Sequence, residues 1–199
     1  MRPISPIIFK TERLYAREFV LGDADAVFGM SNNSFDLGYM YWEPMDEEMA
    51  FRYAEACVAQ QLELPRRTFT LALCLKETDE FIGIISLELT DDRMQASAGY
   101  MIARAHRQRG YASEALRGLL AFGFLGPGLH RITASCDEKN TASYRAMERA
   151  GMRREGHFSK AVYALVNGRR SWRSTYLYAM LQKDFLMSLE DGAYSPSGS

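Results

Sequence analysis

The chain of 199 residues contains little cysteine, little histidine and no long apolar run. Its three cysteines, Cys57, Cys74 and Cys136, are far apart, which argues against both a metal-binding cluster and a disulfide framework. The longest uncharged stretch in the middle of the chain, Gly118 to Leu129, is too short and too interrupted by glycine and proline to cross a bilayer. The amino terminus lacks the apolar segment of a signal peptide. We therefore expect a cytoplasmic protein with no membrane partner and no bound metal.

The composition that is present is average for a folded protein, with 47% hydrophobic and 25% charged residues. A chain of this length is expected to form one domain with a sizeable core. We place that domain at residues 1–186 and expect residues 187–199, which are rich in Gly, Ser and Pro, to form a disordered tail. The net charge of −1 argues against a nucleic-acid partner.

The charges are distributed unevenly along the chain. From Glu18 to Glu63 there are ten acidic residues and one basic residue, whereas from Arg104 to Arg173 there are fourteen basic and five acidic residues. This asymmetry has two interpretations: chance together with solvated helix faces, or two regions with ligands of opposite charge.

Hydrophobic periodicity predicts the order β-α-α-β-β-β-α-β-α-β-β, which indicates a mixed α/β (α+β) domain around one sheet. The predicted helices begin near residues 23, 46, 112 and 140. The dipeptide Asn167-Gly168 is the strongest hairpin signal in the chain. The predicted strands cover residues 13–19, 69–75, 81–89, 95–102, 131–136, 158–166 and 169–181.

The most informative segment joins the strand that ends at Ile102 to the helix that begins near Ala112. It is a basic loop that contains Arg107, Arg109 and the single glycine Gly110. The start of a helix presents unpaired backbone N–H groups and a positive dipole end, and glycine allows a ligand to approach the backbone closely. The spacing alone fits either a diphosphate site or a basic surface loop with a turn glycine. The sequence contains neither of the nucleotide-binding patterns G-x-x-x-x-G-K-[ST] and G-x-G-x-x-G.

The segment Arg107-x-x-Gly110-x-Ala112 resembles the acyl-CoA pyrophosphate loop of the GNAT N-acetyltransferase superfamily. Later segments, Asn140-Thr141-Ala142-Ser143 and the run from Ala150 to Gly156, resemble its RimJ/RimL-type branch of ribosomal-protein N-terminal acetyltransferases. The opening Thr11-Glu12-Arg13-Leu14 and the closing hairpin are also typical of that branch. The resemblance covers residues 8–186. It implies a mixed central sheet of about six to seven strands with about four helices, in which the fourth and fifth strands splay apart.

The resemblance also implies that acetyl-CoA is the co-substrate and assigns residues to it. Tyr100, Met101 and Ile102 match the strand whose backbone pairs with the pantetheine arm, in the manner of an added strand. The loop after Arg107 matches the residues whose backbone N–H groups bind the pyrophosphate. Asn140 matches a residue that touches the pantetheine arm, and Ser143 matches a hydroxyl that donates to the leaving thiolate. The loop residues matched to the pyrophosphate are Gln108, Arg109, Gly110, Tyr111, Ala112 and Ser113.

The chain departs from the family pattern where a general base or acid is often found. Ser97, Met147 and Ser174 stand where relatives carry Glu, Tyr and Asp, respectively. Glu88, on a neighbouring predicted strand, is the best remaining carboxylate for a base, and the alternative is a solvated strand residue. Tyr144 offers a phenol near the thiol, and the alternative is that it only packs.

The resemblance predicts an acetyl-CoA-dependent N-acetyltransferase in which a primary amine attacks the thioester directly, with a protein or peptide N-terminus as the candidate acceptor. The alternatives are a small-molecule amine acetyltransferase and a non-catalytic acyl-CoA-binding module. Tyr41, Trp42 and Glu43 lie where the acceptor groove of the family begins, so we expect them to line it. The oligomeric state is open between monomer and homodimer.

Overall fold

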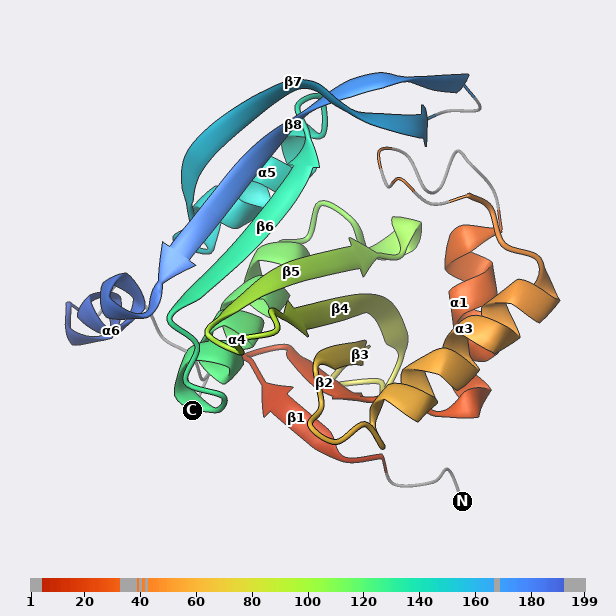
Figure 1. The fold of residues 1–199 in the computed structure, drawn as a ribbon. Coiled ribbons are helices and arrows are strands. Elements are labelled where there is room, and N and C mark those ends of the chain that lie inside the picture. Colours follow the sequence, from red (N-terminus) through yellow and green to blue (C-terminus); the bar gives the residue numbers. More distant parts are fainter. Residues whose placement is uncertain (1–4, 33–38, 40, 42, 167–168, 192–199) are drawn as a thin grey trace.

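The computed structural model of the chain describes residues 5–32, 39, 41, 43–166 and 169–191. Within this part, eight strands form one sheet in the order β1-β2-β3-β4-β5-β6-β8-β7 (Figure 1). The strands are β1 (Ile7–Lys10), β2 (Leu14–Glu18), β3 (Thr68–Leu75), β4 (Phe81–Leu89), β5 (Gln95–Ile102), β6 (Arg131–Asp137), β7 (Arg153–Val166) and β8 (Arg169–Leu181). The helices are α1 (Ala24–Ser31), α3 (Glu47–Gln60), α4 (Tyr111–Leu125), α5 (Thr141–Arg149) and α6 (Gln182–Glu190), with short 3-10 turns η1 (Leu21–Asp23) and η2 (Arg104–His106).

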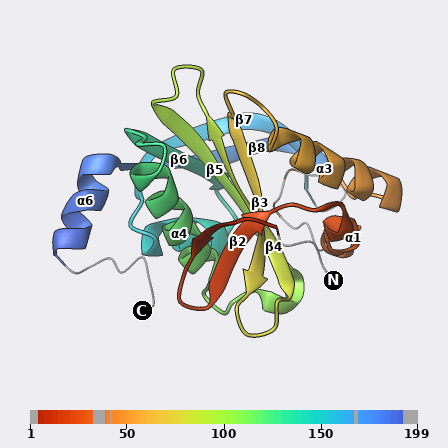
Figure 2. The same ribbon diagram turned by 90° about the horizontal axis from the view of Figure 1, so that it is seen from below.

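Helices pack on both faces of the sheet and divide the core into two clusters (Figure 2). On one face, α4 buries Leu116, Leu119 and Leu120 completely, as the apolar spacing of this helix predicts. On the other face, α1 and α3 pack on Ala72, Ile84 and Met101. Glu88, near the end of β4, is exposed, so the helices leave this part of the sheet uncovered.

The sheet splits between β5 and β6, and this confirms the predicted splay. These two strands are parallel, but they pair only over the first half of each, from Gln95 with Arg131 to Ala98 with Ala134. The last residues of β5, 99–102, remain paired with β4, while β6 stays with β8 to its end at Asp137. The carboxyl ends of β5 and β6 thus diverge, which leaves one edge of β5 open to a ligand.

Three differences from the predicted elements concern short or marginal segments. The strand β1 is not predicted because only four residues form it and none of them is fully buried. Helix α6 buries only Phe185, so its apolar signal is weak, and it continues to Glu190, past the domain end expected at residue 186. Strand β7 begins at Arg153 rather than at residue 158, because two irregularities interrupt its alternation.

The predicted final hairpin forms, with Val166 opposite Arg169. Its turn, Asn167-Gly168, lies outside the described residues, as do residues 192–199. Of the helices that the structure describes, none combines the length and the apolar character needed to span a membrane.

Candidate functional site

The loop before α4 ends in a helix start that is open to an anion. Gln108 and Gly110 have positive φ angles of 63° and 83°, and Gly110 occupies the N-cap position. The first helical bond runs from the Glu114 N–H to the Gly110 carbonyl at 3.1 Å. The N–H groups of the three residues before Glu114 therefore point out of the helix end. Because glycine carries no side chain to cap them, they face the solvent together with the positive end of the dipole.

Arg107 connects this loop to the open edge of β5. Its Nε donates to the carbonyl of Ile102 at 2.9 Å, so the side chain lies along the end of the strand. Arg109 is exposed, and its carbonyl accepts a hydrogen bond from Arg13 Nη1 at 3.1 Å. The sequence pattern points to these arginines as phosphate ligands. The structure shows in addition that Arg107 joins the loop to the strand.

The backbone of β5 alternates between its two neighbours, and this places specific groups in the gap. The Ala103 N–H donates to the Ile82 carbonyl at 2.8 Å, and Met101 lies opposite Ile84 in the same ladder. In an antiparallel pair, alternate residues direct their N–H and C=O groups away from the partner strand. The backbone groups of Tyr100 and Ile102 therefore point toward the gap between β5 and β6. Met101 instead packs its side chain against the α1 and α3 cluster.

Three predicted residues meet across the gap. The Tyr100 hydroxyl donates to the Ser143 carbonyl at 2.9 Å and lies 3.0 Å from Ser143 Oγ. Asn140 caps α5, because its Oδ1 accepts from the Ser143 N–H at 3.2 Å. Burial raises the pKa of Tyr100 well above its usual value. A neutral phenol and a hydroxyl group thus lie together where the strands separate.

Cys136 lies next to this cluster and is not among the predicted site residues. Its side chain is hydrogen-bonded to Ser143, and burial raises the pKa of its thiol to about 11. A thiol with so high a pKa is a poor nucleophile at neutral pH. We therefore assign Cys136 to the wall of the gap.

Tyr144 makes ring contacts on the side of α5 that faces β7 and β8. Its ring meets Tyr176 in an edge-to-face contact at 5.8 Å, and the guanidinium of Arg154 lies 5.6 Å from its centroid. Arg154 also lies 4.0 Å from the centroid of Tyr176 and donates to the Tyr178 hydroxyl at 2.8 Å. These contacts hold α5 against β7 and β8.

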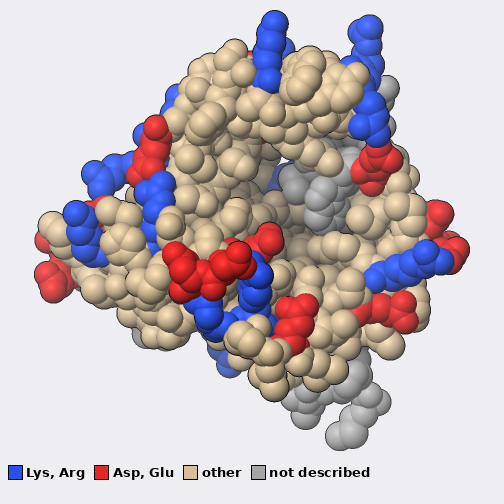
Figure 3. Space-filling view, in the orientation of Figure 1, with Lys and Arg blue, Asp and Glu red and all other residues tan. Residues whose placement is uncertain are grey.

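Glu88 is exposed on β4 and lies directly opposite Ser97 in the β4–β5 ladder. Residues opposite each other in a ladder project from the same face of the sheet, with Cβ atoms about 4.5–5.5 Å apart. The carboxylate of Glu88 is therefore close to the position where the family carries its glutamate. Figure 3 shows the surface of this side of the molecule hollowed between the β7–β8 hairpin and the strands below it.

The segment before α3 reaches across to the β7–β8 hairpin. Glu43 forms an ion pair with Arg170, so its carboxylate is already partnered. The Tyr41 hydroxyl donates to Asp137 Oδ2 at 3.1 Å, and burial raises the pKa of Tyr41. Trp42 lies outside the described residues.

Asp137 is the centre of this contact and was not predicted from the sequence. Its carboxylate is buried and accepts from Arg173 Nε at 2.6 Å and from Arg173 Nη2 at 3.0 Å. Burial acts to raise the pKa of Asp137, but Arg173, the Lys139 N–H and Tyr41 outweigh it and hold the pKa below its usual value. An acidic residue at the end of a strand is common in sequence, and only its arginine partner 36 positions later reveals its role.

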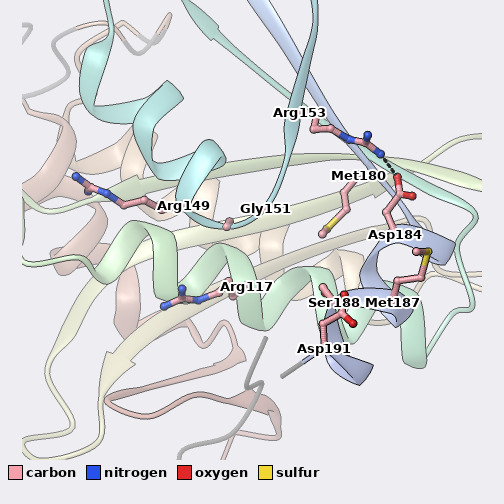
Figure 4. A pocket seen from close by; sticks show the side chains of 10 residues that line it. Arg117, Arg149, Gly151, Arg153, Met180, Asp184, Met187, Ser188 and Asp191 are labelled. Carbon is pink, nitrogen blue, oxygen red and sulfur yellow. Dashed lines mark hydrogen bonds and ion pairs between the residues drawn. The ribbon is translucent and has the colours of Figure 1, made fainter. Parts of the chain in front are cut away.

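A cavity of about 360 Å³ lies elsewhere, between α4, the end of α5 and α6 (Figure 4). Arg153 and Asp184 form an ion pair on its wall, and Met180 and Met187 contribute apolar surface. None of the residues predicted for the site lines it. We therefore separate this cavity from the open edge of β5.

Comparisons with known proteins agree with this geometry. The family model described as an acetyltransferase (GNAT) domain matches residues 13–153. The chain is 31% identical over 175 residues to the uncharacterized N-acetyltransferase YnaD of Bacillus subtilis (strain 168), covering 88% of this chain and 97% of that protein.

Solved structures share the fold. One is the spermidine N-acetyltransferase from Vibrio cholerae in complex with CoA and spermine, with a TM-score of 0.74 and 22% identity over 87% of this chain and 98% of that one. Another is RimL, the ribosomal L7/L12 alpha-N-protein acetyltransferase in complex with CoA, with a TM-score of 0.75 and 19% identity over 88% of this chain and 98% of that one. The chain belongs to the GNAT family and is an acetyl-CoA-dependent N-acetyltransferase.

Proposed function

We propose that this chain transfers an acetyl group from acetyl-CoA to the α-amine of a protein or peptide by direct attack while both substrates are bound. The observation that carries the proposal is the open edge of β5, which ends at the uncapped start of α4. A pantetheine arm is extended and rich in amides, so it can pair with the backbone groups of Tyr100 and with the N–H of Ile102, whose carbonyl is already bonded to Arg107. The diphosphate at the end of that arm then meets the N–H groups of Gln108 to Ser113.

The residues across the gap supply the polar contacts for the reaction. A backbone N–H on the open edge of β5 donates to the thioester oxygen as negative charge develops on it. The neutral amine nitrogen forms a bond to the carbonyl carbon and the C–S bond breaks. Ser143 donates a hydrogen bond to the departing thiolate, which takes up the proton that the nitrogen loses as it becomes an amide. Tyr100 orients the Ser143 hydroxyl. Asn140 uses its side-chain oxygen to cap α5, so its side-chain NH2 group can donate to the pantetheine arm. Holding both reactants in this geometry lowers the barrier by about 7–11 kcal/mol.

The acceptor side has features that suit a cationic amine. The exposed acidic residues Asp46, Glu47, Glu48 and Glu55 lie on or next to α3, with Glu48 paired to Arg52. Glu88 is exposed on β4, on the same face of the sheet as Ile84, which packs against the α1 and α3 cluster. An α-amine has a pKa of about 8, so it is mostly protonated at neutral pH and is attracted to such a surface. The name of RimL, an alpha-N-protein acetyltransferase, supports a protein N-terminus as the acceptor, while the spermidine enzyme supports a small polyamine as the alternative.

A thiol-release assay tests the proposed function. The protein is incubated with acetyl-CoA and a panel of short peptides with free N-termini, small diamines and polyamines, and the free CoA thiol is measured. We expect release with peptide α-amines and none with N-terminally blocked peptides that lack lysine. Release with polyamines alone would favour the small-molecule alternative. CoA binding by calorimetry without thiol release from any amine would contradict catalysis and favour the binding module.

We propose Glu88 as the general base, and this predicts the pH dependence of a variant. At pH 7 about a tenth of an α-amine with a pKa of about 8 is already neutral. A base that deprotonates the rest therefore raises kcat/KM about tenfold at this pH. We expect Glu88→Gln to lower kcat/KM for a peptide about tenfold at pH 7 and less at pH 8.5, where the amine is neutral without help. A pH–rate profile of both proteins measures this.

A second variant distinguishes the base from a surface charge. Adding Ser97→Glu to Glu88→Gln returns a carboxylate to the strand position opposite residue 88, so we expect the activity at pH 7 to rise again. Glu155→Gln is the control, because Glu155 is on β7 and pairs with Arg131. An equal loss at every pH, or no recovery in the double variant, would show that Glu88 is not the base.

A further inference from the structure

Glu114 presents an electrostatic problem at the start of α4. It lies in the first turn of the helix, beside the N–H groups that the proposed function assigns to a diphosphate, and it is 6% exposed. A carboxylate in the first turn stabilises the helix itself. Toward a bound diphosphate, however, it is a like charge in a poorly solvated place, where repulsion is strong. A charge in that position therefore has to be neutralised if the site is to bind CoA.

The turn between β1 and β2 supplies the neutralising charge. Glu114 Oε1 accepts from the Thr11 hydroxyl at 2.6 Å and from the Arg13 N–H at 2.7 Å. Glu114 Oε2 accepts from Arg13 Nε at 2.7 Å and lies 2.6 Å from Arg13 Nη2. Both carboxylate oxygens are thus bonded to residues 11–13. Burial acts to raise the pKa of Glu114, but the bonds from Thr11 and Arg13 outweigh it and keep the pKa below its usual value.

The same arginine also contacts the loop that the diphosphate would meet. Its Nη1 donates to the Arg109 carbonyl at 3.1 Å, and its guanidinium carbon lies 4.5 Å from the ring centroid of Tyr111. A Cβ atom built on Gly110 would lie 3.4 Å from Arg13 Nη2, so the guanidinium lies directly beside the left-handed glycine. One side chain therefore touches Arg109, Gly110, Tyr111 and Glu114.

We propose that Arg13 is a positioning residue for the diphosphate of CoA: it cancels the charge of Glu114 and holds the Arg109 carbonyl so that the loop keeps its N–H groups directed outward. This rests on the proposed function of the loop. It gives the Thr11-Glu12-Arg13-Leu14 segment a role in binding although it is about a hundred residues away in sequence. Arg13 therefore affects the binding of acetyl-CoA. It has no separate effect on the binding of the amine acceptor.

The proposal predicts a selective loss of CoA affinity in Arg13→Met. We expect the Kd for CoA, measured by calorimetry, to rise about tenfold. Arg13→Met with Glu114→Gln removes the unpaired charge as well, so we expect that double variant to bind within about threefold of the wild type. Arg13→Lys retains a charge but cannot contact both Glu114 and the Arg109 carbonyl, and its Kd should lie between these values.

Two controls separate positioning from general stability. Arg17→Met removes a comparable buried ion pair on β2, because Arg17 bonds to both oxygens of Asp23 at 2.7 and 2.8 Å. It should lower the melting temperature and leave the Kd for CoA unchanged. The second control is S-acetylpantetheine, an acetyl donor without the diphosphate. With this donor, kcat/KM of Arg13→Met should equal that of the wild type.

The outcomes distinguish this inference from the function on which it rests. A rise in the Kd for CoA that is reversed by Glu114→Gln and absent with S-acetylpantetheine supports it. An unchanged Kd in Arg13→Met, with normal CoA binding by the wild type, overturns the inference alone. An equal loss in Arg17→Met would also overturn it, because the effect would then follow stability. A wild-type protein that binds no CoA would overturn the proposed function and the inference together.

Discussion

Gly110→Val is expected to weaken CoA binding about 100-fold, because it strains the backbone of the loop and places a side chain where the diphosphate would lie. Gly110 has a φ of 83°, a conformation that β-branched residues rarely adopt, so the loop has to rearrange. A side chain at this N-cap position also begins 3.4 Å from Arg13 Nη2 and projects beside the N–H groups of the first turn. Calorimetry with CoA measures the loss directly.

Gly128→Val is the matched control for this variant. Gly128 also has a positive φ, of 72°, and a Cβ there meets nothing within 4 Å. It follows α4 and is distant from the loop in sequence. Both variants should lose a similar amount of stability from backbone strain, and only Gly110→Val should lose CoA affinity. If Gly128→Val lost as much affinity, or Gly110→Val none, the loop would not be the diphosphate site.

Arg173→Met is expected to lower the free energy of unfolding by about 3–5 kcal/mol at pH 7, because it leaves the Asp137 carboxylate buried without its cation. The side chain of Asp137 is 0% exposed and that of Arg173 is 16% exposed, so water cannot replace the partner. The pair joins the end of β6 to β8 beside Tyr41, so its loss also loosens the contact between Tyr41 and these strands. Urea denaturation of both proteins gives the difference.

The pH dependence of that difference follows from the pKa of Asp137. In the wild type this pKa is lowered on folding, so the ionised carboxylate contributes stability above the unfolded value, near 3.9, and loses it as pH falls through the folded value. In the variant, burial without the cation raises the pKa, so the carboxyl protonates earlier. The penalty should therefore be largest at neutral pH. It should begin to shrink above about pH 4, where the carboxyl of the variant protonates, and keep shrinking until the wild-type carboxyl protonates as well.

Arg153→Met provides the comparison, since Arg153 pairs with Asp184 but is 74% exposed. Exposed pairs contribute about 0–1 kcal/mol, so this variant should be nearly neutral. A penalty in Arg173→Met as small as that, or one that grows on acidification, would show that Asp137 is not a buried carboxylate held by its arginine.

Local patterns in the sequence were sufficient for the elements that build the site. The apolar stripe of α4, the glycine before it and the capping residue Asn140 each act within a few residues, and the structure places all three as predicted. The family resemblance places Tyr100 and Ser143 beside the same ligand, but the hydrogen bond between them is seen only in the structure. The weak elements β1 and α6 were missed because their apolar signals are short.

The contacts that hold the site together could not be read from the sequence. Arg13 and Glu114 are about a hundred residues apart, and Asp137 and Arg173 are separated by α5 and β7. A charged residue is most often solvated, so nothing local distinguishes these four from the other acidic and basic residues. Glu43, which we expect to line the acceptor groove, illustrates the same difficulty, because its ion-pair partner Arg170 comes from the far hairpin.

The sequence by itself determined the family, the order of the longer elements and the position of the basic loop before α4 that we propose for CoA, because each depends on residues close together in the chain. The uneven charge along the chain was ambiguous at that level. Only the tertiary structure decided which charges are paired and which stay exposed, because ion pairs form between strands and loops that folding brings together. It left Glu47, Glu55 and Glu88 exposed, and enclosed Glu114 and Asp137 with their arginines.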